Sequence, residues 1–185
     1  HPPAFGDFDR FDWTPQRRRS NRLPYPHPNR FAVAWNDEAL WLLFRLGEPD
    51  VDASRREGRP TPGAGVWGAS NVDCFLSPKP ESGVYYQVAA NIHGAVYGAR
   101  CRGREWDSAW PLGVTAAVQC LPDRWELILR VPFSGMDAFA PRPGARLRLA
   151  VNRGQMCLSP STLGGWPDGG SWHRIETMGE TMLTP

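Results

Sequence analysis

The residue best placed to contact a ligand is Trp67, which stands near the end of a long segment rich in glycine and proline. Residues 47–70 read GEPDVDASRREGRPTPGAGVWGAS, in which Gly and Pro recur too often for a regular helix or strand. Loops of this length are uncommon unless they are functional or disordered, so this one is a candidate binding rim. Gly65 and Gly68 offer the indole little local cover. Trp67 is therefore either a platform that faces a ligand or a plug folded over the end of the domain, and both interpretations stay open.

A second loop with tryptophans lies near the C-terminus and reads CLSPSTLGGWPDGGSWH. Its four glycines permit many backbone paths, so Trp166 could be presented outwards. Trp172 comes directly before His173 and the last expected strand, where a tryptophan is more often a core residue. Of the two, Trp166 is the stronger candidate for ligand contact.

The sequence lacks the short motifs of the common enzyme classes. It contains no Gly-x-Ser-x-Gly elbow, no phosphate-binding glycine loop and no His-Glu-x-x-His motif. Two carboxylates that meet in space can hydrolyse a glycosidic bond, but the Asp and Glu residues here fall mostly in turns or on outward strand faces, where solvation explains them. His27, His93 and His173 show no metal-ligand spacing. We therefore expect a non-catalytic protein that requires no cofactor.

Asp50 and Asp52 are weak candidates for metal ligands. They flank Val51 in the long loop, and their carboxylates could supply oxygen ligands to calcium. Ordinary solvation in a loop is the simpler explanation of the same pattern.

The cysteines match no zinc site, because the sequence has no Cys-x-x-Cys pair. Cys101 and Cys120 end two consecutive expected strands, which makes them the candidate disulfide pair. An even number of cysteines in a chain with Pro-rich loops is compatible with export. The alternative is that the cysteines are buried free thiols, which pack as small hydrophobic residues.

The elements that must position these residues are organised around residues 31–46, FAVAWNDEALWLLFRL. Apolar residues alternate on both sides of Asn36-Asp37-Glu38, and Asn and Asp favour turn geometry, so the pattern predicts a β-hairpin. The second strand is apolar on nearly both faces. It should therefore lie inside a sheet that is covered on both sides, and not at an edge.

Short alternating segments continue along the chain with turn residues between them. They show no convincing amphipathic helix, although residues 134–139 could form one helical turn. The pattern predicts an all-β fold, an antiparallel β-sandwich of the jelly-roll or immunoglobulin-like kind over residues 31–185. The further expected strands cover residues 71–77, 84–91, 95–101, 114–121, 125–131, 145–153 and 175–183.

Residues 1–30 form an irregular leader that is rich in proline and arginine. Its aromatic residues are too numerous for a freely solvated tail, so some of them should dock on the sandwich or on a partner. These residues are Phe5, Phe8, Phe11 and Trp13.

Length and charge limit the possible functions. A chain of 185 residues is expected to form one domain, and a formal net charge of +2 gives no reason to expect nucleic acid as a partner. No apolar run approaches the length that spans a membrane. The sequence begins at His1 without a Met, which we interpret as proteolytic processing or cloning.

The order of motifs resembles the family 9 carbohydrate-binding module and its DOMON-like β-sandwich relatives, over residues 30–183. The resemblance implies a secreted or periplasmic, non-catalytic sandwich that binds saccharides and often carries structural calcium. The motifs are WNDEALWLLFRL, the long loop, NVDCFLSP, YYQVAANIHGAVYGAR, RWELILRVPFSGM, PGARLRLAVNR and the tryptophan-rich loop before HRIETMGETML.

The resemblance also implies a site in which two Trp side chains clamp a sugar ring. Trp67 matches the first by position, and Trp166 or Trp172 the second. Aromatic faces pack on the C–H groups of a pyranose, while charged and amide groups bind its hydroxyls. The matching polar residues are Asp73, where the family usually carries Glu, Arg100 or Arg102 after the YYQ strand, and Asn152.

Two other functions remain open. The sandwich could have lost sugar binding and serve as an accessory docking subunit of a larger envelope protein complex, which the aromatic leader and the pair Trp106 and Trp110 would favour. Some DOMON-like relatives hold haem through Met with Lys or His, and the corresponding residues here are Met156, Met178 and Lys79. No Cys-x-x-Cys-His attachment motif accompanies them.

Overall fold

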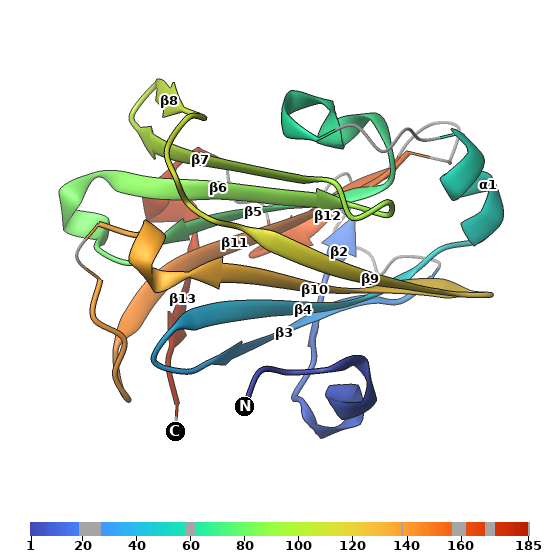
Figure 1. The fold of residues 1–185 in the computed structure, drawn as a ribbon, viewed down its shortest axis with the longest axis horizontal. Coiled ribbons are helices and arrows are strands. Elements are labelled where there is room, and N and C mark those ends of the chain that lie inside the picture. The colour runs from blue at the N-terminus through green and yellow to red at the C-terminus, as the bar shows by residue number, and fades with distance from the viewer. Residues whose placement is uncertain (19–26, 58–61, 138, 157–161, 169–172, 185) are drawn as a thin grey trace.

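Two antiparallel β-sheets pack face to face and form a sandwich (Figure 1). The computed structural model describes residues 1–18, 27–57, 62–137, 139–156, 162–168 and 173–184. Figure 1 shows the smaller sheet in front of and below the larger one, with the described N- and C-terminal ends on the same side. The smaller sheet has five strands, in the order β1 (Thr14–Pro15), β3 (Asn29–Trp35), β4 (Ala39–Gly47), β10 (Arg124–Pro132) and β9 (Thr115–Leu121).

The larger sheet has eight strands and supplies the surface on which the candidate site lies. One edge of β11 pairs with β5, and its other edge pairs with β12 and, further along, with β13. The order is β2 (Arg17–Arg18), β12 (Thr162–Trp166), β11 (Arg146–Gln155), β5 (Asn71–Ser77), β6 (Val84–Asn91), β7 (Val96–Arg102) and β8 (Glu105–Asp107), with β13 (Gly179–Met182) beside β11.

The hairpin expected at residues 31–46 is confirmed as β3 and β4. Trp35 pairs with Leu40 across the turn, and the side-chain oxygen of Asn36 accepts hydrogen bonds from the backbone N–H groups of Glu38 (2.8 Å) and Ala39 (3.1 Å). Strand β4 lies between β3 and β10, so it is an inner strand as the sequence predicts. The antiparallel sandwich is confirmed as well.

The core between the sheets comes from the inward-facing residues of alternating strands. In β4, Leu40, Leu42, Phe44 and Leu46 contact this core, and in β10 every second residue from Trp125 does so. Since each strand has a period of two, the residues between them face outwards. The same alternation in β5, β6 and β11 determines which side chains reach the candidate site.

The leader covers the outer face of the smaller sheet. Phe8 is fully buried there against Trp41 and Leu43, and Phe5, Phe11 and Trp13 pack around it. Figure 1 shows the short coil η1 beneath β3. The leader then pairs with both sheets, through β1 with β3 and through β2 with β12, so it crosses an edge of the sandwich.

The long segment after β4 contains helical structure, which the sequence did not predict. Residues 51–57 form the α-helix α1 (Val51–Glu57), because the Asp50 carboxylate accepts the backbone N–H of Ala53 (2.7 Å) and the side chain of Val51 is buried. The 3₁₀ helices are η1 (Phe5–Arg10), η2 (Gly63–Gly68), η3 (Pro80–Ser82), η4 (Phe133–Gly135) and η5 (Ile175–Thr177).

The predicted disulfide between Cys101 and Cys120 is wrong. Both thiols are free. Cys101 belongs to the cluster on the outer face of the larger sheet, whereas Cys120 lies in β9 of the smaller sheet and packs against the core between the sheets. Cys157 lies outside the described residues.

Within the part of the chain that the structure describes, no helix is long and apolar enough to cross a membrane.

Candidate functional site

A pocket of about 380 Å³ opens on the outer face of the larger sheet, beside η2. Strands β5, β6 and β11 form its base, and η2 brings Trp67 to its side. The described residues that line it are Trp67, Asn71, Asp73, Gln87, Asn152, Arg153, Gly154, Met156, Leu163 and His173.

The polar residues of the base come from neighbouring strands and share one face. Asn152 of β11 lies directly opposite Asp73 of β5, and Gln87 lies on the diagonal, opposite Phe75. Residues in such positions on adjacent strands are close enough for their side chains to interact. Asn152 donates from its side-chain amide to the backbone oxygen of Asp73 (3.2 Å), so the amide is held in place.

Asp73 is the electrostatic centre of the pocket. Burial raises the pKa of its carboxyl from 3.8 to about 7, while hydrogen bonds from Gln87 and Trp67 act in the opposite direction. The Gln87 amide donates to both carboxyl oxygens at 3.0 Å. The carboxyl can therefore either accept or donate a hydrogen bond close to neutral pH.

Trp67 packs against a neighbouring aromatic ring and lies beside Asp73. Its ring packs on Tyr97 with the centroids 4.9 Å apart, and Asp73 lines the same pocket. The side chain is half-buried and lines the pocket, so the alternative of a plug over the end of the sandwich does not describe it. The result is a fixed aromatic surface next to a cluster of hydrogen-bonding groups.

The rim of the pocket combines apolar and aromatic residues. Met156 and Leu163 are both exposed although they are large and hydrophobic. His173 makes a hydrogen bond to the hydroxyl of Tyr85 (3.1 Å) and packs edge-on against Phe75. Burial lowers the pKa of His173, which favours its neutral form.

The structure does not bring Trp166 to Trp67. Trp166 lies opposite Val151 on the inner face of the larger sheet, and its ring packs on Phe31 with the centroids 5.5 Å apart. A methyl group on Gly179 would overlap this ring, so the glycine provides the space that it fills. Trp166 is therefore a core residue, and our prediction that it faces outwards is wrong.

Arg100 also lies away from the pocket. Arg100 pairs with Tyr86, whose side chain belongs to the core between the sheets. The side chain of Arg100 therefore points to the opposite side of the sheet from that of Asp73. Its Nε donates to Asp137 (2.6 Å) and its guanidinium stacks on Trp110. Arg102 shares this side of the strand. Trp172, the other candidate, lies outside the described residues.

Asp50 and Asp52, the weak candidates for calcium ligands, lie at the start of α1. The Asp50 carboxylate caps α1, and Asp52 is exposed in the first turn of that helix. Among the described residues, no group of three or more His, Cys, Asp or Glu side chains could hold a metal ion.

Met156, Met178 and Lys79, the residues considered for haem, lie in different places. Met178 is buried in the cluster on the outer face of the larger sheet, whereas Met156 is exposed at the rim of the Trp67 pocket. Lys79 lines a different pocket.

Sequence reasoning missed Gln87 and Gly165. Gln87 lies in the YYQ segment, and its position on the same face as Asp73 could have been read from the period of two once the hairpin register was known. Gly165 lies opposite Asn152, and a Cβ atom there would come within 2.6 Å of the Asn152 side-chain oxygen. The close approach of β12 gave no local signal, because the glycines around it suggested only flexibility.

Comparisons with solved structures place this fold among carbohydrate-binding modules. A proposed carbohydrate-binding protein from Bacteroides uniformis ATCC 8492 is 18% identical, with 96% of this chain and 88% of that chain covered and a TM-score of 0.71. A family 9 carbohydrate-binding module from Caldicellulosiruptor kristjanssonii, in complex with glucose, is 15% identical with 100% and 90% covered and a TM-score of 0.71.

A family 9 module from the same organism in complex with cellotriose gives a TM-score of 0.63, at 17% identity over 95% of this chain and 84% of that chain. No protein-family model matches the sequence, and no curated protein matches it. The chain therefore has the fold of family 9 carbohydrate-binding modules, and the Trp67 pocket must be interpreted from its own residues.

Proposed function

We propose that this protein is a non-catalytic carbohydrate-binding domain that holds a saccharide in the Trp67 pocket. One observation carries the proposal: a half-buried tryptophan, whose ring packs on Tyr97, lines a pocket together with amide and carboxyl groups on the outer face of the larger sheet of a sandwich with this fold. Pockets that combine an aromatic surface with a few convergent polar groups are typical of small-ligand sites.

Each part of the pocket has a role that suits a sugar. The face of Trp67 packs against the C–H groups of a pyranose ring, and the hydroxyls at the ring edge exchange hydrogen bonds with Asp73, Gln87 and Asn152. Gln87 and Asn152 each carry both a donor and an acceptor, as do sugar hydroxyls. Because Trp166 lies in the core, Trp67 is the only tryptophan among the described residues that line the pocket. Met156 and Leu163 add apolar contacts at the rim.

The composition of the pocket supports a binding role and not hydrolysis. Asp73 is the only carboxylate among the described residues that line it. Glycosidases usually place two carboxyl groups on either side of the bond that they cleave. A single carboxyl that Gln87 already holds by hydrogen bonds is suited to hold a hydroxyl in place.

We propose that the protein acts outside the cytoplasm, either in the periplasm or as a secreted protein. This location rests on the resemblance of the sequence motifs to exported modules. The free thiols of Cys101 and Cys120 remove the disulfide as an argument for it. Fractionation of the native host, followed by immunodetection, tests the location, and a signal confined to the cytoplasm would contradict it.

The binding proposal can be tested by affinity gel electrophoresis on soluble glucans together with a glycan array. We expect retardation of the wild-type protein and its loss in Trp67→Ala, because the stacking surface is removed. Trp35→Phe is the control, since Trp35 lies in β3 of the smaller sheet and does not line the Trp67 pocket. Equal binding by wild type and Trp67→Ala, or binding to no saccharide, would overturn the proposal.

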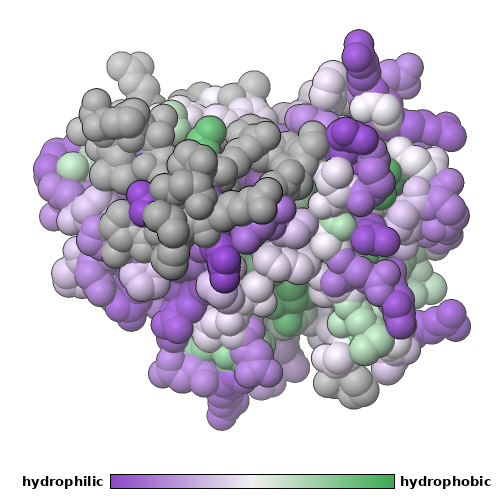
Figure 2. Space-filling view, turned by 180° about the vertical axis from the view of Figure 1, so that it is seen from behind, coloured by the Kyte–Doolittle hydropathy of each residue, from purple (hydrophilic) through white to green (hydrophobic). Residues whose placement is uncertain are grey.

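The docking alternative loses its main support in the structure. The aromatic leader residues pack on this domain itself, with Phe8 fully buried. On the face shown in Figure 2, outside the grey residues, hydrophobic residues form small separate areas among hydrophilic ones. A partner surface usually requires a broader apolar patch.

A further inference from the structure

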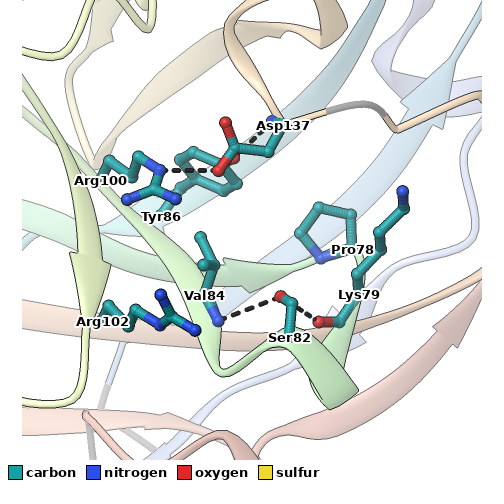
Figure 3. A pocket seen from close by; sticks show the side chains of 8 residues that line it. All are labelled: Pro78, Lys79, Ser82, Val84, Tyr86, Arg100, Arg102 and Asp137. Atoms are coloured by element: carbon teal, nitrogen blue, oxygen red, sulfur yellow. Dashed lines mark hydrogen bonds and ion pairs between the residues drawn. The ribbon is translucent and has the colours of Figure 1, made fainter.

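A second pocket, of about 330 Å³, lies near the end of β7, on the opposite side of the larger sheet from Trp67. Arg100 and Arg102 are two residues apart on β7 and therefore share one face of the strand. Figure 3 shows them on one side of the pocket, with Pro78 and Lys79 on the other and Asp137 between them at the far end. The described lining residues are Pro78, Lys79, Ser82, Val84, Tyr86, Arg100, Arg102 and Asp137.

The lining carries an excess of positive charge. It holds three cationic side chains and one carboxylate, which gives a formal charge of +2. The chain as a whole also carries only +2, so this small area is far more cationic than the average surface. Lys79 is the only lysine of the chain, and the other side chains with a permanent positive charge are all arginines.

Two of these cations are available to a ligand. The side chains of Lys79 and Arg102 are exposed, and within the described residues neither makes an ion pair or hydrogen bond. Other exposed arginines of the described chain have a carboxylate partner, as Arg146 has in Glu180 and Arg174 has in Glu176.

The third cation is fixed in position. Arg100 donates from Nε to Asp137 at 2.6 Å, and its guanidinium stacks on Trp110 at 4.9 Å from the ring centroid. The backbone N–H of Asp137 donates to the Tyr86 hydroxyl at 2.5 Å. The charge of Asp137 is thus compensated by Arg100, and the guanidinium keeps further N–H donors that this bond does not use.

Apart from Ser82, whose hydroxyl donates to the Lys79 backbone oxygen, the remaining lining residues are apolar or aromatic. Val84 and Tyr86 belong to the core between the sheets, and Pro78 follows β5 directly. An inorganic ion needs only the cations, whereas this surface also offers contact to the organic body that carries an anionic group.

From these features we propose that the pocket formed by Lys79, Arg100 and Arg102 binds an oxyanion, the phosphate or sulfate group of a small organic ester. Arginine matches the planar edges of such groups with paired N–H donors, and lysine adds a compact charge. The ester body rests against Val84 and Pro78, which line the pocket. This site is separate from the Trp67 pocket and does not depend on saccharide binding there.

Isothermal titration calorimetry at constant ionic strength tests the site with inorganic phosphate and with phenyl phosphate. We expect saturable binding of the wild-type protein that weakens by about fivefold or more in Arg102→Ala and in Lys79→Ala, as expected for loss of a hydrogen bond to a charged group. Arg104→Ala is the control, because Arg104 is exposed in the turn after β7 and does not line the pocket. Circular dichroism confirms that each variant is folded.

Tighter binding of phenyl phosphate identifies an organic ester as the ligand class, and equal binding of both identifies the oxyanion group alone. Absence of saturable binding, or an equal loss in Arg104→Ala, would overturn the site. Trp67→Ala should retain the affinity for phenyl phosphate, and Arg102→Ala should retain binding to neutral saccharides. The two binding proposals can therefore be overturned independently. Loss of phenyl phosphate binding would contradict only the oxyanion site, and loss of saccharide binding would contradict only the Trp67 pocket.

Discussion

Asp73 shows how a single residue can serve both the fold and the site. Its carboxyl is buried in the pocket that Trp67 also lines, and the two hydrogen bonds from the Gln87 amide hold its orientation. Desolvation disfavours the charged form, so the folded protein holds the proton to about pH 7. The unfolded chain releases it near the ordinary value of 3.8.

This difference predicts a pH dependence of stability. Below pH 3.8 the carboxyl is protonated in both states, and its favourable contribution is fully present. As the pH rises from 3.8 to 7, the unfolded chain ionises while the folded protein keeps its proton, so the contribution is progressively lost. Each pKa unit corresponds to about 1.4 kcal/mol, which limits the total effect to about 4 kcal/mol.

Asp73→Asn should remove this dependence, because an amide does not titrate. We expect the free energy of unfolding of the variant to change less than that of wild type between pH 4 and pH 7, as measured by urea denaturation. Asp37→Asn, at the exposed turn between β3 and β4, should keep the wild-type profile. Parallel profiles of wild type and Asp73→Asn would show that the carboxyl is not buried as described.

Side-chain direction separates the residues that sequence could place from those that it could not. Asp73 and Asn152 lie in regularly alternating strands, where the period of two determines the face, and both line the Trp67 pocket. The predicted directions of Trp166 and Arg100 depended on where the loops end and on the strand register. A shift of one residue in the register moves a side chain to the other face of the sheet. Both point away from that pocket.

Strand β12 is the element that brings the glycine-rich segment against the site. It pairs with β11 next to Asn152, and the space between them admits only a glycine at position 165. A Cβ atom there would approach the Val151 carbonyl oxygen to 2.5 Å, which a real side chain cannot do without a shift of the backbone.

Gly165→Ala should therefore displace β12 and disturb the Asn152 amide. We expect a loss of stability of about 1–3 kcal/mol, typical of overpacking, together with weaker saccharide binding. Thermal denaturation and calorimetry measure the two effects. Gly6→Ala is the control, since nothing lies within 4 Å of a Cβ atom at Gly6, and it should change neither quantity. A stable Gly165→Ala protein with unchanged binding would show that the close approach is not required.

The elements themselves were predictable to different degrees. The β3–β4 hairpin and strands β5, β6, β9, β10 and β11 follow from alternation between turn residues, because burial on one face imposes that pattern. Helix α1 was hidden in a segment that reads as a loop, and its N-terminus depends on one cap, Asp50. The short strands β1, β2 and β12 form through tertiary pairing, which a local pattern does not reveal. Strand β13 lies within the strand predicted at residues 175–183, of which residues 175–177 form η5 instead.

At the scale of the whole molecule, a buried ion pair joins the two sheets. Glu48 follows β4 of the smaller sheet and Arg153 belongs to β11 of the larger one, and their side chains are 0% exposed with N and O atoms 2.5 Å apart. Trp125 donates to the same Glu48 oxygen at 3.3 Å, and Arg153 stacks on its ring. This network lies beneath the Trp67 pocket, which Arg153 also lines.

Glu48→Gln should destabilise the protein by about 3–5 kcal/mol, because it removes the negative charge of a carboxylate that pairs with the buried guanidinium of Arg153. Chemical denaturation measures the loss. Replacing both residues, as Glu48→Gln with Arg153→Met, should recover part of it, since no unpaired charge remains. A single variant within about 0.5 kcal/mol of wild type would contradict the burial of this pair.

The central claim is that a saccharide packs on Trp67 and that Trp166 is part of the core. The most direct measurement follows the indole N–H signals of the nine tryptophans by NMR during titration with glucose and with cellotriose, each assigned by substitution. We predict a saturable shift of the Trp67 signal, while the signal of Trp166 stays unchanged. A shift of Trp166 with Trp67 unaffected, or no saturable shift of any indole signal, would contradict this account.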